Sequence, residues 1–190
     1  MVADPREARV RLGGAGALPG FHGIMSDVRF DRNGELVGRD EVLRLRSLRH
    51  DDGSVESLLG WKGPTGVSPE GYKTRRELEY VVAGGNSDPR ALLEVLGYRQ
   101  VYAIDRYVEY HHLGSAVVRL EWYPKMDVLV EVEGDPRGIE AGLAALGLPR
   151  SAYTAEPLVV FAGRYAARTG HPAILSLAEL AGEAPSWVSR

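Results

Sequence analysis

The sequence predicts an α+β fold in which eight antiparallel β-strands close into a barrel with flanking α-helices. Two observations favour this class. In the first two thirds of the chain, runs of alternating apolar and charged residues are separated by Gly, Asn and Asp turn residues, which is typical of antiparallel strands. Elsewhere, Asp-Pro pairs precede apolar stripes of helical period, which is how many helices begin. Eight strands with short links are enough to close a barrel.

The strand assignment depends on period-two alternation and on the turn residues between runs. Asp51-Asp52-Gly53 between two alternating runs predicts a hairpin. Short links between successive runs favour antiparallel pairing. We expect strands at Glu7–Leu12, Met25–Asp31, Glu41–Leu48, Val55–Lys62, Tyr72–Ala83, Arg99–His111, Ala116–Tyr123 and Val128–Gly134.

The helices have clearer boundaries. Asp88-Pro89 supplies an N-cap and a first-turn proline, and Gly97 follows as a C-cap. The same pattern predicts a helix from Asp135-Pro136 to Gly147. A third helix is expected from about Pro157 to Arg168, before Gly170, and a short fourth around Leu175–Leu180.

Composition and charge exclude several classes of protein. The chain has 190 residues, and 23 basic against 26 acidic residues give a net charge of −3. This balance, with a pI near 6.0, disfavours a nucleic-acid binder. There is no cysteine, which removes disulfides and thiolate chemistry. No apolar run approaches the roughly 20 residues that span a bilayer, so we expect a cytoplasmic protein that binds no membrane.

The length and the lack of a long linker predict one domain over residues 1–190, with its core at 7–170 and a C-terminal helix and tail at 171–190. Charged residues recur on single faces of the expected strands, since residues i and i+2 share a face. Leu43-Arg44-Leu45-Arg46 places two guanidiniums on one face, and Glu131 and Glu133 likewise share one. One interpretation is a sheet with a solvated outer face. The other is a charged interior covered by helices, which suits an anionic ligand with a divalent cation.

The order of these motifs resembles the CYTH superfamily, named after class IV adenylate cyclase and thiamine triphosphatase and also called triphosphate tunnel enzymes. The matching segments span residues 7–170. They are EARVRL, the D-x-x-F-D strand at Asp27–Asp31, VLRLRS, GWKGP, RRELEYVV, LLEVLGYR, the strand around Arg106, VRLEW and DVLVEVEG.

The resemblance implies a closed eight-stranded tunnel that binds a triphosphate moiety with Mg²⁺ or Mn²⁺. It implies that phosphate is bound by Arg11, Arg44, Arg46, Lys62, Arg75, Arg106 and Arg119. It implies metal ligands at Glu7, Glu131 and Glu133, with Glu77 and Glu79 as supporting acidic residues. We expect Lys62 to act closest to the chemistry, because neighbouring positive charge should lower its pKa; a structural ion pair is its alternative.

Three positions, in two motifs, depart from the family pattern. Arg9 stands where the first strand usually has a second glutamate, and Arg29 stands where the second strand often has a tyrosine. Arg11 replaces the lysine that ends the first motif, which keeps charge but changes hydrogen-bond geometry. These changes shift the interior towards positive charge and favour polyanion binding over metal-dependent turnover.

The leading hypothesis is a divalent-metal-dependent triphosphatase acting on inorganic triphosphate, thiamine triphosphate or ATP. Three alternatives stay open. They are a class IV adenylate cyclase, a degenerate tunnel that binds polyphosphate or nucleotides without turnover, and a barrel that binds an apolar ligand if the charged faces point to water. No nucleic-acid partner is expected, and a homodimer is compatible with the resemblance.

Overall fold

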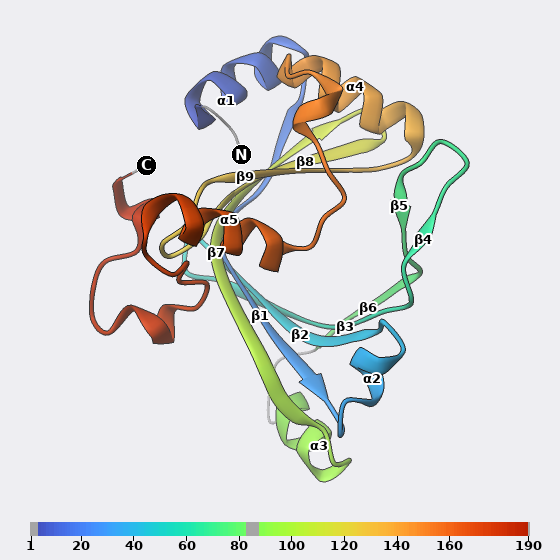
Figure 1. Ribbon diagram of the computed structural model, residues 1–190, viewed down its shortest axis with the longest axis vertical. Coiled ribbons are helices and arrows are strands. Elements are labelled where there is room, and N and C mark those ends of the chain that lie inside the picture. Colours follow the sequence, from blue (N-terminus) through green and yellow to red (C-terminus); the bar gives the residue numbers. More distant parts are fainter. Residues whose placement is uncertain (1–3, 83–87, 190) are drawn as a thin grey trace. The chain divides into compact units, whose positions relative to one another are not determined.

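The computed structural model describes residues 4–82 and 88–189. Figure 1 shows the elements in their chain order. They are α1 (Pro5–Gly14), β1 (Leu18–Asp31), α2 (Glu35–Gly38), β2 (Val42–His50), β3 (Val55–Lys62), β4 (Gly66–Val67), β5 (Lys73–Thr74), β6 (Glu77–Val81), α3 (Pro89–Val95), β7 (Arg99–Leu113), β8 (Ala116–Trp122), β9 (Leu129–Glu133), α4 (Pro136–Leu146) and α5 (Leu158–Thr169). Short 3-10 turns lie at Arg150–Ala152, Leu177–Leu180 and Ser186–Ser189.

The fold is α+β with a large sheet, as predicted, but the sheet has seven described strands and not eight. Their order is β6-β3-β2-β1-β7-β8-β9, and β4 pairs separately with β5. This order has an end at β6 and another at β9, so the described pairings do not form a closed ring. Closure into a tunnel stays a prediction.

The sequence predicted a first strand at Glu7–Leu12, and this prediction is wrong. This segment lies in helix α1, where the Asp4 side chain caps the Arg6 N–H at 2.8 Å and Pro5 occupies the first turn. Ala8 and Leu12, one helical turn apart, are the buried positions. Helical spacing of the apolar contacts therefore prevails over the apparent alternation.

The chain divides into two compact units, which are described separately: a central unit, Ile24–Asp105, and a terminal unit, residues 4–23 with 106–189. In the central unit, β2 pairs antiparallel with β3, and β3 with β6. The predicted Asp51-Asp52-Gly53 turn joins β2 to β3, with Gly53 at a φ of 87°, a conformation that glycine adopts without strain.

The expected strand Tyr72–Ala83 is interrupted. Lys73–Thr74 form β5 and Glu77–Val81 form β6, while Arg75 and Arg76 lie between them outside either strand. The β4–β5 hairpin extends beyond β3 and β6 (Figure 1). Ala83, the expected end of the strand, lies outside the described residues.

In the terminal unit, β8 pairs antiparallel with both β7 and β9. Helix α4 packs on β8 and β9 and also contacts α1 (Figure 1). Leu143 and Leu146 of α4 are buried together with Val118 and Leu120 of β8. The contact is close at Gly142, where an added Cβ would lie 2.8 Å from a methyl of Val132.

Three predicted helices are confirmed. Asp88 caps α3 through the Arg90 and Ala91 N–H groups. Asp135 caps α4 through Gly138, and Gly147 ends that helix in the left-handed region. Helix α5 ends at Gly170, whereas the short fourth helix is a 3-10 turn. No helix in the described ranges is long and apolar enough to span a membrane.

Candidate functional site

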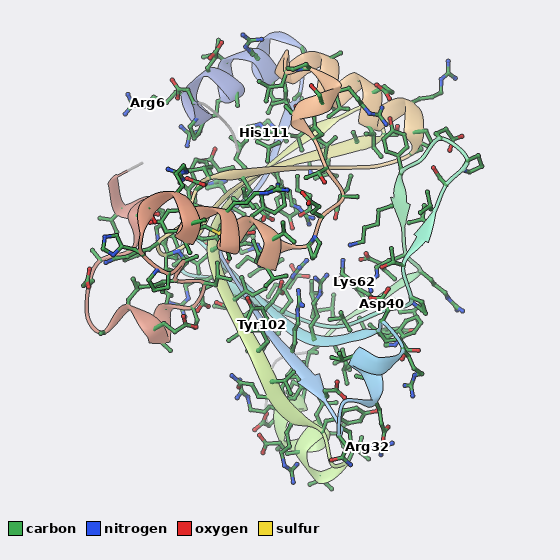
Figure 2. All side chains as sticks on the ribbon, in the orientation of Figure 1. Arg6, Arg32, Asp40, Lys62, Tyr102 and His111 are labelled. Carbon is green, nitrogen blue, oxygen red and sulfur yellow. The ribbon has the colours of Figure 1, made fainter. Side chains whose placement is uncertain are left out.

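One face of β2, β3 and β6 in the central unit carries basic side chains. Because the strands pair antiparallel, Arg44 lies opposite Gly60 and then Glu79, and in the next row Val42, Lys62 and Glu77 align. Figure 2 labels Lys62 at the end of β3. Arg44 and Arg46 are buried, with 7 % and 6 % exposure. The alternative in which these charges lie on a solvated outer face is therefore wrong for both arginines.

Arg46 is held by a carboxylate that sequence analysis did not assign. Its Nε and Nη2 donate to the two oxygens of Asp27 at 2.7 and 2.9 Å. Asp27 is itself buried and lies 3.7 Å from Arg44 Nη1. This geometry is the paired-fork arrangement of guanidinium and carboxylate, and it fixes the direction of the Arg46 side chain.

Arg44 keeps a free donor. Its Nη2 donates to Glu79 Oε1 at 2.6 Å, whereas its Nε is buried and has no hydrogen-bond acceptor among the described residues. Gly60 lies between the two side chains, where a Cβ would be 3.3 Å from the Nε and 3.4 Å from Glu79 Oε1. The glycine thus leaves room for the Arg44 guanidinium at this point of the sheet.

The carboxylates of β6 neutralise the basic face. Lys62 Nζ donates to Glu77 Oε1 at 2.7 Å. Burial raises the pKa of Glu79, but the hydrogen bond and charge of Arg44, with the charges of Arg46 and Lys62, lower it further, so the net direction is down. Glu77 and Glu79 are partly exposed. A negatively charged ligand can therefore reach Lys62 and Arg44 and replace Glu77 and Glu79 as their hydrogen-bond acceptors.

Arg75 does not join this face. Its Nη2 donates to the Asp40 carbonyl oxygen at 2.6 Å and also to the Asp40 carboxylate. Asp40 (Figure 2) additionally accepts the Thr65 N–H at 2.7 Å. Hydrogen bonds from Thr65 and the charge of Arg75 lower the pKa of Asp40 to about 2. Arg75 thus connects the residues just before β2 to the segment between β5 and β6.

A second charged cluster lies in the terminal unit around Arg119 of β8. Its Nη2 lies 2.7 Å from Glu131 Oε2 and 2.6 Å from Glu133 Oε1. Arg119 faces Glu131 across the strand pair and Tyr110 on the other side, and its Cζ lies 5.5 Å from the Tyr110 ring centre. Burial opposes the charge of Arg119, but the three nearby glutamates prevail and raise its pKa well above the usual value.

Glu121 contacts both arginines of this cluster and one tyrosine. Its Oε1 lies 3.3 Å from Arg106 Nε and 3.7 Å from Arg119 Nε, and its Oε2 accepts the Tyr123 hydroxyl at 2.6 Å. All four side chains are buried. Burial and the Glu121 charge raise the pKa of Tyr123 well above its usual value. Neither Glu121 nor Tyr123 was predicted from the sequence to have a role, although Arg119 and Glu121 occupy alternate positions on one face of β8 and Tyr123 follows the end of that strand.

Two of the predicted site residues lie elsewhere. Glu7 and Arg11 are on helix α1 and pair with each other at 2.6 Å, both exposed. Their expected roles depended on a strand that does not form. Arg9, next to them, donates two hydrogen bonds of 2.7 Å to Glu109. Arg29, at the family tyrosine position, lies 5.4 Å from the Tyr102 ring centre in the central unit.

A cavity of about 290 Å³ opens at the start of α1, between Arg6, Arg9, Trp122 and Met126. None of the residues predicted to bind phosphate or metal lines it. The two charged groups described above, one in each unit, and not this cavity, are therefore the candidate sites.

The fold has close counterparts among solved structures. A protein from Pyrococcus horikoshii matches with a TM-score of 0.65 at 20 % identity, over 82 % of this chain and 92 % of its own. A Vibrio parahaemolyticus protein, named as a proposed adenylate cyclase, matches with a TM-score of 0.67 at 16 % identity, over 84 % and 92 % of the two chains. The chain shares the fold of these proteins, which is consistent with a CYTH superfamily fold.

A third counterpart shares this fold over nearly the whole length. It is a Hippeastrum protein named as a proposed adenylyl cyclase with a dominant triphosphatase activity, and it matches at 17 % identity with a TM-score of 0.58, over 94 % and 95 % of the two chains. No family model and no curated protein sequence matches the chain.

The residues present in this CYTH fold were expected to hold Mg²⁺ or Mn²⁺. A Mg²⁺ site in a protein commonly has one or two carboxylates, with phosphate oxygens and water completing it. Glu131 and Glu133 have that chemistry, but a guanidinium nitrogen already contacts both. In the described part of the chain, no three acidic or histidine side chains are grouped so that they could hold a metal ion. The donor set as it stands does not fit a divalent cation.

Proposed function

We propose that the chain binds the triphosphate moiety of a small molecule through its buried basic side chains and hydrolyses a phosphoanhydride bond. The observation that carries this proposal is the buried Arg44 Nε, which has no hydrogen-bond acceptor among the described residues. A buried Nε without an acceptor is costly, and an anionic oxygen would satisfy it. Arg46 and Lys62 lie on the same face of the sheet, so several donors are available to one polyanion.

The ion pairs of this face prepare it for such a ligand. Asp27 fixes the Arg46 guanidinium, while the partly exposed Glu77 and Glu79 accept hydrogen bonds from Lys62 and Arg44. We expect phosphate oxygens to replace Glu77 and Glu79 as acceptors. Arginine suits this task because its fork donates two parallel hydrogen bonds to a phosphate.

Catalysis would follow from positioning and charge. In phosphoryl transfer the protein chiefly holds the phosphoryl group in line and stabilises charge on its oxygens. In the proposed reaction water attacks the terminal phosphorus, the bridging P–O bond breaks, and triphosphate plus water gives diphosphate plus orthophosphate. Lys62 is the proposed donor nearest this bond, because its ammonium is more exposed than the guanidiniums of Arg44 and Arg46.

The adenylate cyclase reaction is the second candidate, favoured by the names of two structural counterparts. There the ribose 3′-hydroxyl of ATP attacks the α-phosphorus, and diphosphate leaves. Both reactions use the same kind of phosphate contacts, so their products distinguish them better than the residues do.

The deciding experiment measures products from inorganic triphosphate, thiamine triphosphate and ATP, each with Mg²⁺, with Mn²⁺ and with EDTA. Orthophosphate release supports the triphosphatase. Diphosphate with cyclic AMP from ATP supports the cyclase instead. Tight triphosphate binding without turnover identifies a binding protein, and absence of both binding and turnover overturns the proposal.

Matched variants test the basic face. Arg44→Gln and Lys62→Gln should each weaken triphosphate binding about tenfold or more, since a hydrogen bond to a charged group contributes about 1.5–3 kcal/mol. The controls are Arg49→Gln, exposed on the same strand as Arg44, and Lys73→Gln, exposed on β5. If the four variants bind triphosphate equally well, the ligand does not contact this face.

A further inference from the structure

The position between Glu131 and Glu133 is filled by a side chain of the protein. These two carboxylates occupy alternate positions of β9 and therefore share a face. Arg119 Nη2 approaches both, at 2.7 Å from Glu131 Oε2 and 2.6 Å from Glu133 Oε1. A single nitrogen thus bridges the two oxygens that a divalent ion would need.

The bridging guanidinium is held on its other sides as well. Its Nε lies 3.7 Å from Glu121 Oε1, and its plane is near the Tyr110 ring, with Cζ 5.5 Å from the ring centre. The Arg119 side chain is 9 % exposed, against 49 % and 46 % for those of Glu131 and Glu133. The cation is therefore the buried, fixed member of this group, and the carboxylates are its solvent-facing partners.

Charge favours the guanidinium over a metal ion here. The side chains of Glu121, Glu131 and Glu133 carry three negative charges, and those of Arg106 and Arg119 carry two positive charges. The net charge of these five side chains is therefore −1. A divalent ion would have to displace the two short ion-pair contacts of Arg119 and would lie beside a buried positive charge. Without Arg119, the same group would have an excess of two negative charges and an open position.

We propose that Arg119 takes the place of a divalent cation between Glu131 and Glu133, so that this chain holds no metal ion at that position. The inference goes beyond the proposed function, because it concerns side chains of the terminal unit alone. It makes Arg119 the residue that excludes the cation, where the family resemblance implies a metal site.

The test is a Mn²⁺ titration of the full chain without triphosphate. Electron paramagnetic resonance measures binding as the loss of the free Mn²⁺ signal. The wild type should bind weakly, and Glu131→Gln/Glu133→Gln should leave that affinity unchanged. Arg119→Gln should bind Mn²⁺ about tenfold tighter or better, and adding the two glutamine substitutions to it should abolish the gain. Arg9→Gln, which releases the single carboxylate Glu109, is the control and should show no gain.

Two results overturn the inference: tight Mn²⁺ binding by the wild type that Glu131→Gln/Glu133→Gln weakens, or no gain in Arg119→Gln that has a native circular dichroism spectrum. If Arg119→Gln does not fold, the Mn²⁺ affinities of the wild type and of Glu131→Gln/Glu133→Gln still show whether these two carboxylates bind a metal ion in the native chain. Calorimetric titration with triphosphate, in EDTA and in Mg²⁺, tests the proposed function separately from this inference. Binding in either buffer supports the proposed function, and no binding in either buffer overturns it while the Mn²⁺ result stands.

Discussion

Arg46 and Asp27 form a buried ion pair in which Arg46 Nε donates to Asp27 Oδ1 at 2.7 Å and Arg46 Nη2 donates to Asp27 Oδ2 at 2.9 Å. The two side chains are 6 % and 4 % exposed. In such surroundings each charge depends on the other, because removal of one partner leaves the second buried beside a longer ion-pair contact, 3.9 Å from Arg46 to Glu79 or 3.7 Å from Asp27 to Arg44. The pair also determines where Arg46 can point, so it links the stability of the central unit to the geometry of the basic face.

Asp27→Ala should lower the free energy of unfolding by about 3–5 kcal/mol, the usual cost of an uncompensated buried charge. Urea denaturation followed by circular dichroism measures this change. Asp127→Ala is the control, since Asp127 pairs with the exposed Arg168 at 2.5 Å, and an exposed pair contributes about 1 kcal/mol or less. Equal losses in the two variants would show that the Asp27 pair is solvated.

Strand faces were predictable from the sequence because period two is unambiguous in VLRLRS. The same reasoning failed for EARVRL, where charged residues alternate but Asp4-Pro5 precedes them. That pair is the same N-cap and first-turn proline that correctly located α3 and α4. The capping residues were thus the stronger signal, since they satisfy N–H groups that only a helix leaves unpaired.

Contacts between side chains on different strands were less predictable. Alternation placed Arg44 and Lys62 on strand faces, but it does not give the register that brings Glu79 to Arg44 or Asp27 to Arg46. Arg75 was expected beside them because Tyr72–Ala83 reads as one strand. The strand is interrupted at Arg75, whose guanidinium donates to the carbonyl and carboxylate of Asp40, a partner 35 residues away that no local pattern indicates.

Tyr123→Phe should destabilise the protein by about 1–3 kcal/mol, because it removes the 2.6 Å hydrogen bond that the hydroxyl donates to buried Glu121. Urea denaturation at pH 7 measures the loss. Tyr153→Phe is the matched control: the Tyr153 hydroxyl is buried and has no partner in the described ranges, so its removal should be neutral or stabilising. If both variants unfold at the same urea concentration, the Tyr123 bond adds nothing to stability.

The raised pKa of Tyr123 adds a prediction at alkaline pH. In the unfolded chain the phenol ionises near pH 10, whereas burial and Glu121 keep it protonated to higher pH in the fold. Its contribution to stability is complete below about pH 10 and is lost as the pH rises above that value. Wild type should therefore lose stability between pH 9 and 11 more steeply than Tyr123→Phe, as measured by urea midpoints across that range; parallel curves would contradict this.

Two helix glycines should respond oppositely to alanine. At Gly142 of α4 a Cβ would lie 2.8 Å from Val132 Cγ1 and 3.4 Å from Val118 Cγ2, and overpacking typically costs about 1–3 kcal/mol. At Gly163 of α5 a Cβ meets nothing within 4 Å, so alanine should stabilise that helix by up to about 1 kcal/mol. Thermal melting of Gly142→Ala and Gly163→Ala measures both, and a stabilised Gly142→Ala would mean that α4 can move away from β9.

Asp40 makes the stability of the central unit sensitive to acid. Its pKa is about 2 in the fold and 3.8 in the reference state, so its carboxylate stabilises the fold above pH 3.8, and this contribution is lost as the pH falls through about 2. Asp40→Asn removes the charge but tolerates the same backbone, since Asp40 has a φ of 54° and asparagine also adopts this region. Urea midpoints of the wild type and variant should therefore differ most above pH 5 and converge towards pH 2. A difference that stays constant over this range would show that the Thr65 and Arg75 contacts do not depend on the charge of Asp40.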